Sequence, residues 1–521
     1  MSKFNILGRQ GRGPVTAEAT PSGKTYEGGA GYAHDAKSEL FLLAVANFAG
    51  EDTFYEKGAD RDARYADLVR RVAVGDPEWT ARFLRWLRTG ANLRSASLAG
   101  ALEAAAALRD AGIPGGRAIV DSVLQRADEP GEALAYWTAT RGRAIPKPVK
   151  RGIADAVGRL YHERSLLKYD TASHGFRFAD VIDLTHPSPQ AGKPWQGDLF
   201  AYALNRRHHR DDAEPASLRT LTANRELRRA AAADPAVLLD AGRLSAAGMT
   251  WEDVLSLVGG ALPKAAVWEA LIPGMGYMAL LRNLRNFDEA QVSDEVAERV
   301  CARLADPAEV ARSRQFPFRF LAAYEQAPSL RWGAALDRAL QLSLANVPAL
   351  PGRSLILVDT SASMSSGGFS RRSVMTPAKA AAVFGVALAA RGERVDLHGF
   401  ADRVFEHRVP RGASVLREVD RFVKRIGEVG HGTEIAKSIR RTFRGHDRVF
   451  VISDMQTFAG PGKVTDQVPR STPLYGFNLG GYRRTAFDAG TPNRLEFGGL
   501  TDATFRLVPL IEAGRDAAWP F

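Results

Sequence analysis

Cysteine is almost absent from this sequence. The single residue, Cys301, cannot close an internal disulfide or supply a thiolate zinc cluster. Long apolar runs are also missing, since LILV and AAAVFGVALAA end well short of the roughly 20 uncharged residues that cross a bilayer. The first thirty residues lack the apolar core of a secretory signal. We therefore expect a cytoplasmic protein in a reducing compartment, with no membrane partner.

The composition is that of ordinary globular domains. The 521 residues are 45% apolar and 25% charged, with 49 Gly and 27 Pro, which excludes disorder, collagen-like repeats and coiled coil as the main character. The net charge of +11 would attract a polyanion such as nucleic acid. Many Arg-rich proteins carry such a surplus without binding nucleic acid, so the bulk charge leaves both interpretations open.

A local charge surplus is more informative. Residues 141–174 hold eight basic side chains against three acidic ones, with Tyr161 and Tyr169 interleaved and Phe176 just beyond. Cations interleaved with aromatic rings are typical of RNA-binding surfaces. A solvated helix face is the competing explanation at this stage.

The first two thirds of the chain has helical periodicity. Residues 1–35 are Gly-rich and aperiodic, which predicts a flexible or extended arm. From 36 to 350 short amphipathic helices follow one another, with start signals such as Asp76-Pro77 and Thr250 and a stop at Gly90. Short helices of this kind bury their apolar stripes by stacking in pairs, so we expect a HEAT-like helical repeat domain over 36–350, although no exact repeat length is found.

The periodicity changes at about residue 350. SLILVDT is typical of a strand buried on both faces, and RVDLHGF, RVFVISD, PLYGFNL and TFRLVPL are interpreted as further strands. Helical segments at 376–392, 413–426 and 434–444 lie between them. This alternation predicts a Rossmann-like domain over 351–521 with a parallel-type central sheet. The fold class is therefore multidomain, α followed by α/β.

Oxygen-bearing side chains follow the first of these strands. Asp359, Ser361 and Ser363 form a D-x-S-x-S sequence, and Thr433 and Asp454 come later, Asp454 directly after strand RVFVIS. All five are hard oxygen donors, which suit Mg²⁺. The alternative is that Asp359 and the serines only turn the chain into the next helix.

The same five residues resemble the metal-ion-dependent adhesion site of von Willebrand factor A domains. The resemblance implies that Ser361, Ser363 and either Thr433 or its water contact the metal, and that Asp359 and Asp454 act directly or through water. It also implies that an open position accepts a carboxylate from a partner. Such a site binds and does not cleave. His431 lies close in sequence but is interpreted as a loop residue.

The helical part resembles the TROVE module of the Ro autoantigen family. Residues 148–189 and the segment ALLRNLRNF at 279–287 carry the resemblance, and a von Willebrand A domain follows that module in the family, as here. The resemblance implies a monomeric ring of helical repeats. It also implies that small noncoding Y-like RNA binds outside, that single-stranded 3′ ends of misfolded or aberrant RNA enter the central hole, and that polynucleotide phosphorylase or another exoribonuclease is a partner.

The family's RNA contacts transfer to Lys168 and to His186 in LTHP. The family's KYxxxR pattern is KYDTAS here, so an arginine is missing at Ala172, and His174 is the candidate substitute. Tyr169 and Phe176 are alternatively core residues, and His186 a helix cap. The predicted RNA-binding residues are Arg143, Lys147, Lys150, Arg151, Arg164, Lys168, His174, His186, Arg206, Arg207, Arg282 and Arg285.

Three functions compete on this sequence. The leading one is a non-enzymatic RNA-binding ribonucleoprotein scaffold acting in RNA quality control, since neither half shows a nuclease carboxylate cluster. The second is a magnesium-dependent protein-interaction scaffold that recruits an acidic partner through its A domain. The third is a metal-dependent hydrolase built on Asp359.

Overall fold

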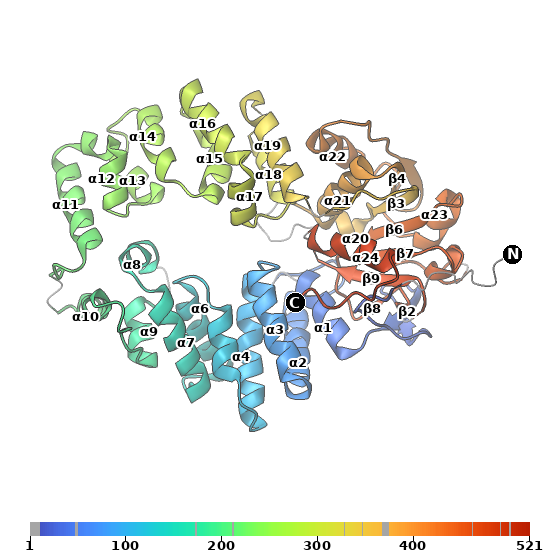
Figure 1. Cartoon of the computed structure of the whole chain (residues 1–521), viewed down its shortest axis with the longest axis horizontal. Coiled ribbons are helices and arrows are strands. Elements are labelled where there is room, and N and C mark those ends of the chain that lie inside the picture. The colour runs from blue at the N-terminus through green and yellow to red at the C-terminus, as the bar shows by residue number, and fades with distance from the viewer. Residues whose placement is uncertain are drawn as a thin grey trace. The chain divides into compact units, whose positions relative to one another are not determined.

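The computed structural model forms two compact units. It describes residues 11–46, 51–171, 175–210, 213–327, 329–345, 347–366, 375–460, 462–489, 491–499 and 502–521. One unit is Val69–Leu304, and the other joins Met1–Leu68 to Ala305–Phe521. The first is helical, and the second contains the strands (Figure 1). The predicted fold class, helices followed by a mostly parallel sheet, is confirmed.

The unit Val69–Leu304 consists of consecutive helices and begins within α2. They are α2 (Gly58–Gly75), α3 (Pro77–Thr89), α4 (Arg94–Asp110), α5 (Gly116–Val123), α6 (Glu129–Arg141), α7 (Lys147–Leu160), α8 (Glu163–Tyr169), α9 (Phe178–Thr185), α10 (Trp195–Arg207), α11 (Arg219–Ala233), α12 (Ala241–Ala246), α13 (Trp251–Val258), α14 (Lys264–Leu271), α15 (Tyr277–Glu289) and α16 (Asp294–Leu304), with short 3-10 helices η1 (Pro235–Leu239) and η2 (Ile272–Gly274).

The predicted start signals act as caps. The Asp76 carboxylate accepts a hydrogen bond from the backbone N of Trp79 at 3.0 Å, and the Thr250 hydroxyl accepts one from Asp253 N at 3.2 Å. Each bond satisfies a backbone donor that the first helical turn leaves free. Gly90 follows α3 directly, as its stop signal predicts.

Small residues let α4, α5 and α7 approach one another closely. A Cβ on Gly152 of α7 would lie 2.7 Å from Arg117 O and 2.8 Å from Val120 Cβ in α5. On the other side of α5, a Cβ on Gly116 would lie 3.1 Å from Cβ of Ala105 in α4. These contacts fix the positions of the helix ends that carry several of the predicted RNA-binding residues.

The second unit is built on a six-stranded sheet of order β5-β4-β3-β6-β7-β9. All its neighbouring pairs are parallel except β4 with the edge strand β5. Four of the predicted strands are confirmed. The strands are β3 (Arg353–Asp359), β4 (Arg394–Phe400), β5 (Val404–Glu406), β6 (Arg448–Ser453), β7 (Leu474–Asn478) and β9 (Arg494–Gly498).

Helices cover both faces of this sheet, as predicted for a parallel arrangement. Alternate side chains of β3 point to opposite faces. Leu355 and Leu357 belong to a core cluster with Ile435 and Ile439 of α23 (Ile435–Thr442). From the other face, the Cα of Gly385 in α21 (Pro377–Arg391) approaches so closely that an added Cβ would lie 2.5 Å from Val358 Cγ2.

The prediction of a strand at TFRLVPL is wrong. Residues Asp502–Arg506 form the 3-10 helix η4, and Leu507–Glu512 form α24, in which Val508 and Ile511 are buried one turn apart. Pro509 could not donate to a central ladder, which argues against a strand there. The last parallel strand is instead β9, whose apolar pattern is interrupted by the buried Glu496.

The N-terminal segment contributes a second, antiparallel sheet. Its strands β1 (Gly23–Lys24) and β2 (Ala30–Ala33) pair with each other, and β2 also pairs with β8 (Arg484–Thr485). The remaining helices are α1 (Ala36–Ala46), α17 (Pro307–Ser313), α18 (Phe318–Gln326), α19 (Leu330–Ser343), α20 (Ala362–Ser365) and α22 (Val415–Val423), with the 3-10 helix η3 (Val464–Gln467). Of the helices in the described residues, none has the length and hydropathy of a membrane span.

Candidate metal centre and nucleic-acid interface

The predicted metal ligands lie at the carboxyl edge of the six-stranded sheet. Asp359 is the last residue of β3, and Ser361 and Ser363 begin α20. Asp454 directly follows β6, the parallel neighbour of β3. The loop that carries Thr433 reaches the same edge, because His431 O accepts from Ala362 N at 2.8 Å, and Thr433 O accepts from Phe458 N at 3.0 Å.

Hydrogen bonds hold the first three of these side chains together. Asp359 Oδ1 accepts from Ser361 N at 2.9 Å, and Asp359 Oδ2 accepts from Ser453 Oγ at 2.5 Å. The hydroxyl oxygens of Ser361 and Ser363 are 3.2 Å apart. Asp359 and Ser361 are fully buried, while Ser363 keeps 8% of its surface exposed. The two hydroxyls therefore face the same small volume.

Asp454 is a buried carboxylate with an unused oxygen. Its Oδ1 accepts from Gln456 N at 3.1 Å, whereas its Oδ2 has no hydrogen-bond partner among the described residues. Burial, followed by the nearby Asp359 carboxylate, raises the pKa of Asp454, and burial also raises the pKa of Asp359. Two buried carboxylates are unfavourable as anions unless a positive charge lies beside them.

A hard divalent cation fits this donor set. The side chains offer only carboxylate and hydroxyl oxygens, which are the ligands that Mg²⁺ prefers. Within the described residues no three His, Cys, Asp or Glu side chains form a metal-binding group, so the hydroxyls are essential to any site here. Ser361, Ser363 and Asp454 are the residues that would hold the ion, with Asp359 fixing the serines.

Some residues of this site were missed from the sequence. Ser453 bonds Asp359, and Gln456 bonds Asp454, yet neither belongs to a recognisable pattern. Gly480 is also required, since a Cβ there would lie 2.8 Å from Asp454 Cβ. His431, expected to be a loop residue, is exposed, and its backbone N donates to Asp402 Oδ2 at 3.1 Å.

The basic window 141–174 divides into paired and unpaired cations. Arg141 forms an ion pair with Glu103 at 2.6 Å, and Arg159 forms one with Asp121 at 2.7 Å. These two side chains serve the packing of the helices. The other basic residues of the window carry the positive charge that remains available to a ligand. Several of them lie around the start of α7.

Cations line a hollow between α4, α5 and α7. The hollow has a volume of about 510 Å³, and Arg109, Arg117, Lys147 and Arg151 are among its lining residues. Arg117 is paired with Asp155 at 2.6 Å. Lys147 and Arg151 are exposed, and among the described residues neither has an ion-pair partner. Positive charge is thus available where a phosphate could enter. Arg109 and Arg117 were missed from the sequence.

Lys168 lies beside an aromatic ring rather than beside a carboxylate. Its Nζ is 5.2 Å from the centroid of the Tyr169 ring, and Cζ of Arg126 is 5.4 Å from the same centroid. Tyr169 and Phe176 are half-buried and line a cavity of about 50 Å³. A cavity of that size has room for a few waters and is too small for a nucleobase. Any base would therefore stack on the outer side of Tyr169.

His186 has a left-handed backbone at the end of α9, with φ of 50°. Its backbone N donates to Ile182 O at 2.9 Å, which ends the helix, so the expected capping role is carried by the backbone. The imidazole is exposed and is free to contact a ligand. Capping and ligand contact are therefore compatible at this residue.

The other predicted RNA-binding residues lie in different surroundings. Arg143, Lys147, Arg151, Arg164, Lys168, Arg206, Arg207, Arg282 and Arg285 are exposed, Lys150 is half-buried, and His174 and the neighbouring Ala172 lie outside the described residues. Arg207 pairs with Asp180 at 3.0 Å, and Arg285 pairs with Glu289 at 2.8 Å. Arg164 donates to Ser245 O at 2.7 Å. These three are the less available for phosphate.

Comparison with known proteins agrees with this architecture. Residues 243–331, which include the segment ALLRNLRNF, match the TROVE domain. The chain therefore contains a segment that is similar to the TROVE domain. The crystal structure of the Deinococcus radiodurans Ro (Rsr) protein superposes with a TM-score of 0.59 at 20% sequence identity, covering 92% of this chain and 99% of that one. The chain therefore has the fold of that Ro protein over nearly its whole length.

Two curated relatives are similar to a short part of the chain. Telomerase protein component 1 of Mus musculus is 46% identical over 83 residues, and that of Rattus norvegicus is 46% identical over 78 residues. The alignments cover 16% and 15% of this chain, respectively. The chain spans only 3% of the length of each relative, so their similarity is confined to one segment.

Proposed function

We propose that this protein is an RNA-binding scaffold whose helical unit holds RNA through its phosphates. The observation that carries the proposal is the pair of exposed, unpaired cations Lys147 and Arg151 at a cation-lined hollow. This hollow occurs in a protein with a TROVE domain match and the fold of a Ro protein. Phosphate contacts of this kind supply affinity without reading sequence.

The ligands that fit the family are small noncoding Y-like RNA and the single-stranded 3′ ends of misfolded RNA. Lys168 with Tyr169, and the exposed ring of His186, offer the mixture of charge and aromatic surface that unpaired bases need. In this proposal the protein acts in RNA quality control as a holder of RNA. Cleavage belongs to a partner exoribonuclease, for which polynucleotide phosphorylase is the candidate.

A second proposal concerns the A domain. Ser361, Ser363 and Asp454 would hold Mg²⁺, Asp359 would fix the serines, and Thr433 would contribute directly or through water. The bound ion would offer an open position to an acidic ligand. The unpaired Oδ2 of Asp454 favours this proposal, because a buried carboxylate oxygen with no partner is costly. An acidic protein partner recruited in this way is the alternative function of the chain.

Purification without nuclease tests the RNA proposal. The full chain would be isolated from its native host, its absorbance ratio at 260 and 280 nm measured, and any bound nucleic acid sequenced. We expect small structured RNA in the purified protein. Protein that carries no RNA and does not bind a hairpin with a single-stranded 3′ tail would contradict the proposal.

A further inference from the structure

A turn of the N-terminal segment is fastened beside the predicted metal site. Tyr26 N donates to Gln456 Oε1 at 2.8 Å, and Gly29 N donates to Thr457 O at 3.0 Å. Both acceptors lie in the loop that follows β6 and begins with Asp454. Glu27 lies between these two anchors. Its position at the carboxyl edge of the sheet is therefore set by bonds on either side of it.

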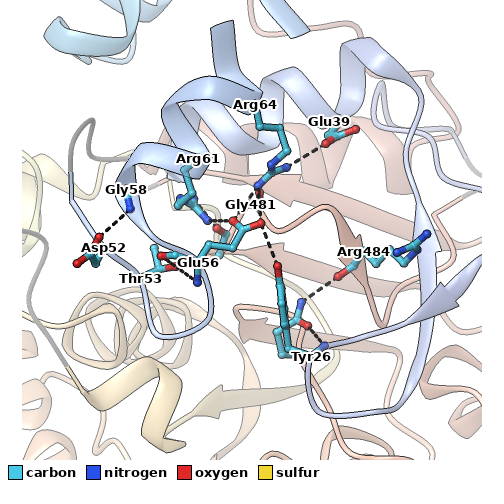
Figure 2. A network of polar contacts seen from close by, with 12 residues as sticks. Tyr26, Glu39, Asp52, Thr53, Glu56, Gly58, Arg61, Arg64, Gly481 and Arg484 are labelled. Carbon is cyan, nitrogen blue, oxygen red and sulfur yellow. Dashed lines mark hydrogen bonds and ion pairs between the residues drawn. The ribbon is translucent and has the colours of Figure 1, made fainter. Parts of the chain in front are cut away.

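A second segment closes over the same edge. Glu56 accepts hydrogen bonds from Arg61 at 2.7 Å, from Arg64 at 2.9 Å and from Tyr26 Oη at 3.2 Å (Figure 2). Arg61 is fully buried and also donates to Gly480 O at 2.8 Å. This network fixes the chain just before α2 against the loop that follows β7.

Tyr55 of that segment joins Glu27 to the metal site. Its ring stacks on Tyr26, with centroids 5.1 Å apart, and its hydroxyl donates to Glu27 Oε1. Its ring also packs edge-on against Tyr482, with centroids 5.5 Å apart, and Tyr482 follows Gly480, where an added Cβ would lie 2.8 Å from Asp454 Cβ. The anchors at Gln456 and Thr457 and the bond to Tyr55 therefore hold Glu27 beside the loop that begins with Asp454.

We propose that Glu27 is an intramolecular carboxylate ligand for the divalent cation held by Ser361, Ser363 and Asp454, positioned by the Tyr55 hydroxyl. The inference rests on the proposed metal site and changes what that site can bind. The open coordination position is filled by the chain's own acid, so an acidic partner binds only by displacing Glu27.

The position and the charge of Glu27 both suit a metal ligand. Glu27 belongs to a different segment from the other ligands, yet two anchors and the Tyr55 hydroxyl hold its side chain at the cluster. Without a cation, the negative charges of Glu27, Asp359 and Asp454 at this edge of the sheet are unfavourable beside one another. A divalent ion removes that repulsion and gains a third carboxylate.

Mn²⁺ binding to the full chain tests the proposal. Mn²⁺ affinity would be followed by loss of the free-ion electron paramagnetic resonance signal, and bound waters by proton relaxation. Glu27→Gln removes the ligand, Glu27→Asp keeps the charge but shortens the reach, and Glu18→Gln removes an exposed acid of the same segment as a matched control. Thermal unfolding of each variant checks that it folds.

We expect Glu27→Gln and Glu27→Asp each to weaken Mn²⁺ binding by about tenfold or more. In each of these two variants the bound Mn²⁺ should carry one more water, and added acetate should bind to the ion. Glu18→Gln should have the affinity and the bound waters of the wild type. Unchanged Mn²⁺ affinity in Glu27→Gln would overturn the inference. It would also be overturned if Glu27→Gln weakened Mn²⁺ binding while Glu27→Asp bound Mn²⁺ as tightly as the wild type, with the same number of bound waters. Asp359→Asn tests the metal site itself. If the wild type binds no Mn²⁺, or if Asp359→Asn binds Mn²⁺ as tightly as the wild type, the proposed metal site is wrong and the inference about Glu27 fails with it.

Discussion

His34 and Glu496 form a fully buried ion pair, with Nε2 of the histidine 2.7 Å from Oε2 of the glutamate. His34 directly follows β2, and Glu496 lies in β9, so the pair ties the N-terminal segment to the large sheet. Burial alone would lower the pKa of His34, but the Glu496 carboxylate outweighs it and the pKa is raised. Asn478 donates to the other oxygen of Glu496 at 2.8 Å.

This pair makes stability depend on pH. A histidine whose pKa is raised on folding stabilises the protein most below its unfolded pKa of about 6.5, and that stability is lost as the pH rises through the folded value. The melting temperature of the wild type should therefore exceed that of His34→Gln by more at about pH 6 than at about pH 9. A difference that grows with pH would contradict this assignment.

Removing one partner of the pair should be costly. His34→Ala leaves a buried carboxylate without its cation, and we expect a loss of about 3 to 5 kcal/mol in the free energy of unfolding. Chemical denaturation measures this loss. Lys437→Ala, an exposed cation of the same unit, is the comparison and should change the free energy of unfolding by less than about 0.5 kcal/mol.

The cation-lined hollow predicts a specific change in RNA affinity. Replacing Lys147 and Arg151 together by Ala should weaken the binding of a single-stranded RNA and reduce the slope of log affinity against log salt by about 1 to 2, because each phosphate contact contributes about 0.7 to 0.9. Fluorescence anisotropy over a salt series measures both quantities. Arg411 and Arg417, exposed arginines of the other unit, give the matched double variant. Equal slopes in the two double variants would remove the hollow from the interface.

His186 predicts a local contact with RNA. Asparagine also adopts the left-handed backbone conformation, so His186→Asn keeps the end of α9 while removing the ring. If the ring stacks on a base, affinity should fall by about 1 to 3 kcal/mol with little change in melting temperature. The sequence identifies the residue to change, whereas the left-handed backbone seen in the structure favours asparagine over alanine as its replacement.

The metal site and the RNA interface should be separable. Asp454→Asn should abolish Mn²⁺ binding, since it removes the unpaired carboxylate oxygen. RNA affinity should stay within about twofold of the wild type, because the exposed cations that carry it lie in the helical unit. Isothermal titration with Mn²⁺ and anisotropy with RNA measure the two. Loss of RNA affinity in this variant would favour a coupled site over two independent ones.

The positions of several proposed metal ligands were predictable because these residues follow apolar strands. Asp359 and Asp454 come directly after β3 and β6, and the carboxyl ends of neighbouring parallel strands meet at one edge. Glu27 and Tyr55 could not be found in this way. They lie in segments without periodicity, hundreds of residues away along the chain, and only tertiary contacts bring them to Asp454.

In the helical unit, the sequence identified the basic residues but not which of them form ion pairs. A basic window in the sequence does not reveal which cations are already paired within the protein. Arg141 and Arg159 pair with Glu103 and Asp121 across neighbouring helices, whereas Lys147 stays unpaired among the described residues. β9 was missed for a related reason, because a buried charged residue interrupts its apolar pattern and its partner lies far away in the sequence.

The dependence of RNA affinity on salt tests the central claim most directly. The affinity of the full chain for a hairpin RNA with a single-stranded 3′ tail would be measured by anisotropy at about 50 and about 200 mM salt. If the helical unit neutralises about six to ten phosphates, affinity should fall by about 10³ to 10⁵ between these conditions. Absence of binding at the lower salt, or an affinity that does not change with salt, would contradict the account.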